Sequence, residues 1–296
     1  MPDANHIAAL VETLPPTDAE LKTPTPKGET PREGKFTGPA PDVADQLCRN
    51  ILDTGPDGLN ALLDMVRDPA EPAYASYKPE YLVHCLTLFA GRPGLEKERR
   101  MLAPAMLRRV QNEDASLYLR LFLIRELQWI GDASAVPVLA GLLTNEELAD
   151  AAAATVVSIG TDAAPHIRRQ LPDAKGRVRL VLLQALGQLR DPEARDLLRA
   201  ALKDEEPEVR IAAAWGLARL GDDGSIQAIL RAADGAKGWE RMRQTGSALL
   251  LAEQLSAHGN KDQATAIYIH LRDTRTEPHE AHIRDAARRA LGVRVA

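Results

Sequence analysis

The sequence is poor in aromatic residues and in cysteine. Aromatic side chains make up 4% of the 296 residues, so leucine, alanine, valine and isoleucine must supply the core. Small aliphatic side chains suit closely spaced helices better than a β-sandwich. The two cysteines, Cys48 and Cys85, provide neither a disulfide framework nor a zinc site. Cys85 stands in the apolar run YLVHCLTLF, where we expect it to be a buried structural residue.

An excess of positive charge is also missing. The chain has 37 basic and 42 acidic residues, a net charge of −5. Nucleic-acid-binding domains usually carry a basic excess or stripe, so we expect no nucleic-acid partner. No stretch approaches the roughly 20 apolar residues of a membrane span, and MPDANHIAAL has no secretory-signal pattern. We therefore expect a cytoplasmic protein that does not contact membranes.

The common catalytic motifs are absent as well. The sequence has no G-x-x-x-x-G-K-[ST] phosphate loop, no G-x-G-x-x-G turn and no G-x-S-x-G nucleophile elbow. The nearest approach to a metal motif is His279-Glu280-Ala281-His282, which lacks the H-E-x-x-H spacing of a zinc site. The sequence therefore predicts no catalytic residue, no cofactor and no metal site.

What the sequence does have is a repeat of about 30 residues. It is visible as turn tripeptides that end successive apolar helical segments, at 130–132, 159–161, 189–191 and 220–222. Each copy is an apolar helical segment, a short turn and a second apolar helical segment. A repeat of this length with two helices is typical of a helical solenoid, because one unit cannot bury its apolar face alone.

Charged residues recur at fixed positions within these copies. The acidic column is Asp114, Asp173 and Asp204, and the basic column six residues later is Arg120, Arg179 and Arg210. The copy between Thr144 and Thr161 lacks both. Because an active site is normally one place and these pairs recur, we interpret them as a structural ladder rather than as acid–base catalysts.

The strings VRLVLLQALGQL and VRIAAAWGLARLGDDGSI resemble HEAT repeats, particularly the short variety first associated with phycobilin lyases. The resemblance is clear over roughly residues 113–235. It implies an all-α fold, a right-handed α-α superhelix of about seven helical pairs plus a C-terminal cap helix. It also implies that the six Asp and Arg residues form a ladder between neighbouring repeats.

The domain organisation follows from proline. Eight of the 20 prolines lie in residues 1–41, which we predict to be a largely disordered tail; residues 42–296 form the solenoid. The spacing of Ile7, Leu10, Val11 and Leu14 allows a short amphipathic helix over 3–14. A frayed tail and a helix that docks on the solenoid or on a partner both fit this pattern.

Candidate partner-binding residues lie in the second helices and after the sixth pair. An arginine recurs about ten residues after the turn, at Arg169, Arg199 and Arg231. These side chains would form a basic stripe for an acidic or phosphorylated protein segment; the alternative is a solvated helix face. Trp239 follows an inserted segment and is a candidate hot spot. Trp129 and Trp215 lie inside first-helix segments, where we expect them in the core.

Three functions follow, in order of preference. The first is a non-enzymatic protein–protein interaction scaffold or adaptor that presents a curved helical surface. The second rests on the resemblance: phycobilin lyases act with a related partner chain on a tetrapyrrole and its acceptor cysteine, which implies a subunit of such an enzyme. The third, a HEAT-like DNA glycosylase, is disfavoured by the acidic net charge.

Overall fold

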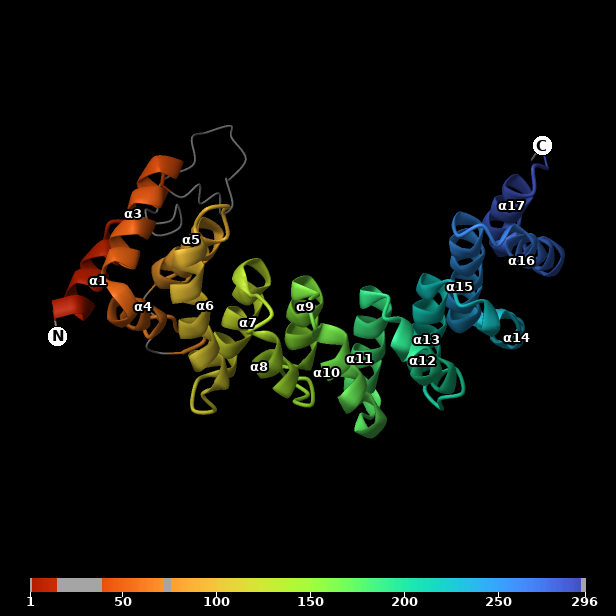
Figure 1. Ribbon diagram of the computed structural model, residues 1–296, viewed down its shortest axis with the longest axis horizontal. Helices are drawn as coiled ribbons and strands as arrows, with labels where there is room; N and C mark the ends of the chain where they lie inside the picture. The colour runs from red at the N-terminus through yellow and green to blue at the C-terminus, as the bar shows by residue number, and fades with distance from the viewer. Residues whose placement is uncertain (1, 15–38, 72–75, 294–296) are drawn as a thin grey trace, which may run out of the picture. The chain divides into compact units, whose positions relative to one another are not determined.

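The computed structural model describes residues 2–14, 39–71 and 76–293. The extended tail predicted within residues 1–41 falls largely on 15–38, which lie outside the described residues. In its described part the chain is all-α, and it forms two compact units, Met1–Val138 and Leu139–Ala296. Figure 1 labels the helices in chain order.

The first unit consists of consecutive helical hairpins and one additional N-terminal helix. Its helices are α1 (Pro2–Glu12), α3 (Pro41–Asp53), α4 (Gly55–Leu63), α5 (Lys78–Ala90), α6 (Glu96–Gln111) and α7 (Leu117–Ile130). Helices α3, α4 and α5 each have proline in the first turn, where its missing N–H has no intrahelical acceptor to lose. The Ser116 hydroxyl caps α7 by accepting the Leu119 N–H.

Helix α1 lies against α4 and α5. Ile7 and Val11 of α1, and Leu14 just after it, are buried. A helix of three turns is marginal in isolation, but burying each aliphatic side chain contributes about 1.5–3 kcal/mol. Helix α1 is therefore part of the core of the first unit.

The second unit repeats a longer first helix followed by a shorter second helix. Its helices are α9 (Ala149–Ile159), α10 (Ala163–Gln170), α11 (Gly176–Leu189), α12 (Arg195–Ala201), α13 (Pro207–Leu220), α14 (Ile226–Gly235), α15 (Gly238–Ala257), α16 (Lys261–Thr274) and α17 (Ala281–Ala290). Helix α8 (Val136–Gly141) crosses the division between the units. The first helices α9, α11, α13 and α15 lie side by side in chain order (Figure 1). Packing of each repeat on its sequence neighbour is the defining property of a solenoid.

In chain order the helices from α3 to α16 form seven hairpins, followed by α17. The predicted fold class, an all-α solenoid of about seven helical pairs with a cap helix, is confirmed. No helix among the described residues is long and apolar enough to span a bilayer.

The segment DGAKGWERMRQTG, which lengthens the repeat before Trp239, is mostly helical. Helix α15 begins within it at Gly238 and has 20 residues, against 14 in α13. Gly238 has a φ of +54°, a conformation that glycine adopts without strain, so the chain turns sharply and the inserted residues extend the helix.

Small residues bring α11 and α13 close together. A Cβ atom on Gly187 would lie 2.9 Å from Gly216 Cα and 2.8 Å from Trp215 Cζ3. Ala213 and Ala214 beside this contact are fully buried. The glycine and alanine positions therefore serve helix packing, and an added methyl group at Gly187 would push the two helices apart.

An arginine occupies the fourth position of five helices. These are Arg120 in α7, Arg179 in α11, Arg210 in α13, Arg241 in α15 and Arg284 in α17. Each guanidinium donates to one or two backbone carbonyls at the end of the preceding helix or, as for Arg210, in the turn that follows it, at 2.8–3.3 Å. The last carbonyls of a helix have no intrahelical donor, and the C-terminus carries partial negative charge. A guanidinium placed there donates hydrogen bonds to these carbonyls and offsets the charge.

Three of these arginines in the second unit also bond to a carboxylate of the following repeat. The pairs are Arg179–Asp204, Arg210–Glu240 and Arg241–Glu280. Of the residues predicted to form a ladder, Asp114 and Asp173 are exposed, and within the described part of the chain their carboxylates bond to no arginine. Glu240 and Glu280 take the acidic role in the later repeats, where no aspartate stands in the predicted column.

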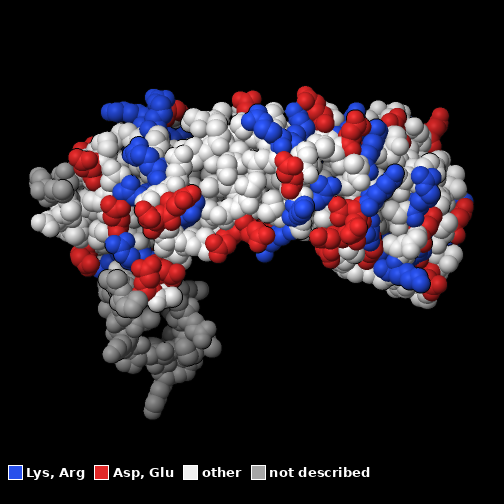
Figure 2. All heavy atoms as spheres, turned by 90° about the horizontal axis from the view of Figure 1, so that it is seen from below, with Lys and Arg blue, Asp and Glu red and all other residues white. Residues whose placement is uncertain are grey.

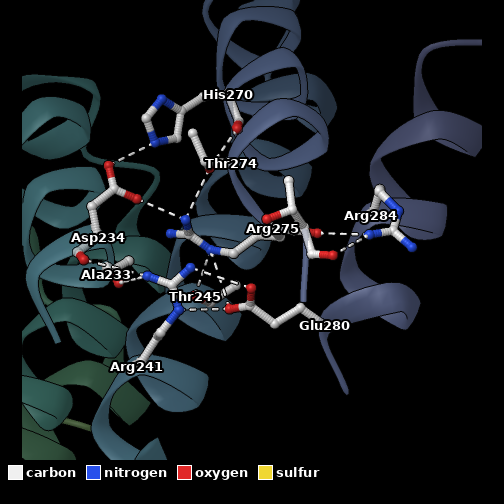
Figure 3. A network of polar contacts seen from close by, with 10 residues as sticks. Ala233, Asp234, Arg241, Thr245, His270, Thr274, Arg275, Glu280 and Arg284 are labelled. Atoms are coloured by element: carbon white, nitrogen blue, oxygen red, sulfur yellow. Dashed lines mark hydrogen bonds and ion pairs between the residues drawn. The ribbon is translucent and has the colours of Figure 1, made fainter. Parts of the chain in front are cut away.

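The ladder ends in the polar network shown in Figure 3. Arg275, after α16, is completely buried; it donates to Asp234 at 2.7 Å and to the Thr245 hydroxyl at 3.0 Å. Glu280 accepts from Arg241 at 2.7 and 3.2 Å, which lowers the pKa of the Glu280 carboxyl. Because Glu280 comes just before α17, this network fixes the last helix to α15 and α16.

Candidate functional site

The three second-helix arginines that predict a basic stripe differ in their surroundings. Arg169 and Arg231 are exposed. Arg199 donates to both carboxylate oxygens of the buried Asp222, at 2.9 and 2.6 Å. The corresponding residue one repeat earlier is Arg168, which bonds to the buried Asp191. Arg199 is therefore committed to a structural ion pair. The use of the stripe by a partner stays a prediction.

The tryptophans are more exposed than the sequence indicates. Trp129 is 62% exposed near the end of α7, so its prediction as a core residue is wrong. Trp215, also predicted as core, is only partly buried. Trp239 in the first turn of α15 is 54% exposed, as is its neighbour Met242. Tryptophan is enriched among the residues that contribute most to binding energy at interfaces, so an exposed tryptophan on a helix is a candidate contact residue.

Trp215 and Trp239 line a groove that follows α13 between α11 and α15. The groove has a volume of about 370 Å³. Leu180, Ile211 and Ala212 complete its apolar lining. Ile211 and Ala212 are nearly buried and form the floor, while the two indoles stand above it. The groove thus presents flat apolar surfaces to a ligand.

The rim of the groove is polar and of mixed charge. Gln184 and Gln188 lie along α11, Glu208 lies at the start of α13, and Arg243 lies one turn after Trp239 on α15. All four residues are exposed. In the described part of the chain the side chains of Glu208 and Arg243 form no ion pair, unlike Arg210 and Arg241 on the same helices. One carboxylate and one guanidinium are therefore available beside the indoles.

Arg219 holds the Trp215 indole in place. Its guanidinium carbon lies 4.9 Å from the ring centroid, and its Nε donates to the Gly187 carbonyl at 2.9 Å. Burial lowers the pKa of Arg219. The guanidinium on one side and the close approach to Gly187 restrict the movement of the Trp215 ring, which reduces the cost of ordering it on binding.

A second hollow, of about 620 Å³, lies between α1 and α4 in the first unit. Ala4, Ala8 and Ala61 line it and offer little beyond methyl groups. Its Asp64 already accepts from Arg109 at 3.0 and 2.8 Å. Although it is larger, this hollow therefore presents fewer uncommitted groups than the groove of the second unit.

Glu126, Cys48 and Cys85 of the first unit are enclosed titratable groups whose surroundings are structural. The buried Glu126 carboxylate lies 3.0 and 3.1 Å from His84 Nδ1, which supplies the partner that a buried carboxylate requires. Burial raises the pKa of the Cys48 thiol to about 12 and also raises that of Cys85. At neutral pH both sulfurs are thiols, which are poor nucleophiles.

The described residues hold no metal centre, and the face shown in Figure 2 carries no field of one charge. Among the described residues, no group of three or more His, Cys, Asp or Glu side chains is arranged to hold a metal ion. On the face shown in Figure 2, basic and acidic side chains are interspersed. Such a mixture is unlike the basic footprint of nucleic-acid binding.

The hairpins, the close packing of the first helices and the arginine contacts between repeats are features that the chain shares with helical-repeat solenoids. Residues 164–249 match the family model described as HEAT repeats. This segment contains most of the groove-lining residues, from Leu180 to Arg243.

Part of the chain is similar in sequence to a phycobilin lyase subunit. Over 100 residues the chain is 34% identical to phycocyanobilin lyase subunit beta of Nostoc sp. (strain PCC 7120 / SAG 25.82 / UTEX 2576). This match covers 33% of the chain and 50% of the relative, so the chain spans about half the length of the curated protein it matches. The predicted resemblance is confirmed.

Two solved structures are distant likenesses. An engineered protein has a TM-score of 0.45 at 17% identity, over 84% of this chain and 70% of its own. The complex of CpcE and CpcF of phycocyanin lyase from Nostoc sp. PCC7120 has a TM-score of 0.37 at 20% identity, over 83% and 88%.

The sequence match corrects one prediction. The protein was expected to be non-enzymatic because the sequence carries no catalytic motif, but the relative it matches is a subunit of a lyase. A helical-repeat subunit needs no motif of the kinds searched for, since its contribution to a reaction can be to bind and orient the reactants.

Proposed function

We propose that this chain is a subunit of a lyase-like enzyme that acts on a tetrapyrrole-carrying protein. The observation that carries the proposal is the 34% identity over 100 residues to a phycocyanobilin lyase subunit. The groove on α11, α13 and α15 supports it, because flat indole faces and an adjacent guanidinium suit a conjugated ligand with carboxylates.

In this proposal the chain binds and orients, while the sulfur that forms the new bond belongs to the acceptor protein. Both thiols of the chain have pKa values raised by burial, and Cys48 is almost completely enclosed. Neither is a thiolate at neutral pH, and a thiolate is the form that attacks carbon. Holding two reactants together is itself a large catalytic effect.

A protein partner is part of the proposal. Arg169 and Arg231 are exposed on second helices of the repeats and are available to an acidic or phosphorylated segment of the acceptor or of a second subunit. Replacing both with glutamate should weaken such an association and leave folding intact, because both side chains are exposed. If this variant associates with the partner as strongly as the wild type does, Arg169 and Arg231 do not bind the partner.

The proposal is tested by titrating the full chain with phycocyanobilin and following visible absorbance and tryptophan fluorescence. We expect a saturable absorbance change at one pigment per chain, because a single ordered conformation of the pigment replaces many in solution. On denaturation the pigment should be released, because this chain supplies no attacking thiolate. Absence of a saturable change would refute the proposal.

A further inference from the structure

We propose that the groove on α11, α13 and α15 is the tetrapyrrole-binding site, with Arg243 on a ligand carboxylate and Glu208 on pyrrole N–H groups. This inference rests on the proposed function and assigns it to named residues. The ligand class is a linear tetrapyrrole with free propionates, whose flat conjugated skeleton carries both hydrogen-bond donors and carboxylates.

The apolar part of the groove fits such a skeleton. Ile211 and Ala212 give a floor without polar atoms, and Trp239 stands beside it with 54% of its surface in solvent. A conjugated ligand that covers Trp239 removes apolar surface from water and stacks on the indole face. Trp215 is restrained by its contacts with Arg219 and Gly187, so less conformational freedom is lost there on binding.

The charges of the rim complement the same ligand. Arg243 lies one turn after Trp239, so a carboxylate on a short chain attached to a stacked ring can reach its guanidinium. Glu208 lies on α13 one turn before Ala212, where its carboxylate can accept pyrrole N–H groups. Nearby Arg210 and Arg241 are paired with Glu240 and Glu280, whereas Arg243 has no ion-pair partner in the described part of the chain.

The mixed rim also argues against a macromolecular polyanion in this groove. A nucleic acid or a strongly acidic peptide would place phosphates or carboxylates against Glu208, and like charges at close range oppose binding. A ligand with separate donor and acceptor regions satisfies Glu208 and Arg243 together. The amides of Gln184 and Gln188 donate and accept, so they accommodate either region.

The test uses two substitutions at exposed positions, Trp239→Ala and Arg243→Glu, in the full chain. Each should raise the dissociation constant for phycocyanobilin about tenfold or more, because stacking and the ion pair are lost separately. The matched controls are Trp129→Phe, at the exposed tryptophan of the first unit, and Arg177→Glu, at an exposed arginine of α11. Both controls should bind within about twofold of the wild type.

A second measurement tests the carboxylate assignment directly. The dimethyl ester of phycocyanobilin lacks the charges that Arg243 is proposed to bind. It should bind the wild type about tenfold more weakly than the free acid, and Arg243→Glu should not weaken ester binding further. If Arg243→Glu weakens binding of the free acid and of the ester by the same factor, Arg243 does not bind a ligand carboxylate.

The outcomes separate the two proposals. If the wild type shows no saturable binding of phycocyanobilin, the proposed function fails. If the wild type binds but Trp239→Ala and Arg243→Glu bind equally well, the function stands and the groove is not the site. Melting temperatures within a few degrees of the wild type would show that both variants are folded.

Discussion

Arg210 offers the sharpest test of the arginine ladder, and we predict that Arg210→Ala destabilises the second unit by about 2–3 kcal/mol. Its Nε and Nη2 donate to Glu240 at 2.8 and 2.9 Å, and its Nη1 donates to the carbonyls of Asp204 and Glu205, both at 2.8 Å. The side chains of Arg210 and Glu240 are 25% and 22% exposed, so solvent screens them only partly.

The magnitude follows from what the substitution leaves behind. A hydrogen bond to a charged group contributes about 1.5–3 kcal/mol, and a buried carboxylate without its partner costs several kcal/mol more. Partial exposure of Glu240 allows water to replace some of the lost contact, which reduces the total. We therefore expect a loss of about 2–3 kcal/mol rather than the 3–5 kcal/mol of a fully buried pair.

The assay is urea unfolding of the full chain followed by circular dichroism, for the two single variants Arg210→Ala and Glu240→Ala and for the double variant. The double-mutant cycle should give a coupling energy of about 1–2 kcal/mol. Arg177→Ala is the control, because its ion pair with Asp150 is exposed (70% and 49%) and should contribute less than about 1 kcal/mol. A loss in Arg210→Ala no larger than in Arg177→Ala would refute the ladder as a stabilising device.

Three further outcomes are expected. Gly187→Ala should lower the unfolding free energy by about 1–3 kcal/mol in thermal or urea melts, since its methyl group meets Trp215; a neutral effect would contradict the close contact. The pKa of Glu280 is lowered by Arg241, so its stabilisation is present above its ordinary value of 4.5 and is lost as pH falls through the lower folded value; Glu280→Gln should flatten this acid limb of stability against pH. Cys48, with a pKa of about 12, should react with a thiol reagent at pH 8 far more slowly than in the unfolded chain, and equal rates would show that it is accessible.

The fold could be predicted because its signals are local and repeated. Turn tripeptides recur about every 30 residues, and each follows an apolar helical segment, so period and helix count can be read directly. The predicted column of arginines six residues after an aspartate contains only some of the arginines that contact the preceding repeat. Arg241 of α15 lies outside it, because no aspartate stands six residues before it. Counting forward from the glycine or proline that begins the helix gives G/P-x-x-R in α11, α13 and α15.

The candidate groove could not be predicted, because it depends on which face of each first helix remains uncovered. Hydrophobicity places Trp129 and Trp215 inside apolar segments but does not show that a neighbouring helix stops short of them. Similarly, Arg199 and Arg169 occupy equivalent places in the sequence to within one residue. A shift of one residue along a helix turns the side chain by about 100° around the helix axis. Arg199 therefore reaches Asp222, whereas Arg169 points to solvent.

The arginine ladder has a consequence for how the second unit unfolds. Each ladder arginine contacts both the end of the preceding helix and a carboxylate of the following repeat, so it couples the folding equilibria of adjacent repeats. In a linear array such nearest-neighbour terms determine whether repeats melt singly or together. Breaking the link at Arg210 should therefore weaken the coupling between the repeats on its two sides, whereas breaking it at Glu280 should weaken only the attachment of the final helix.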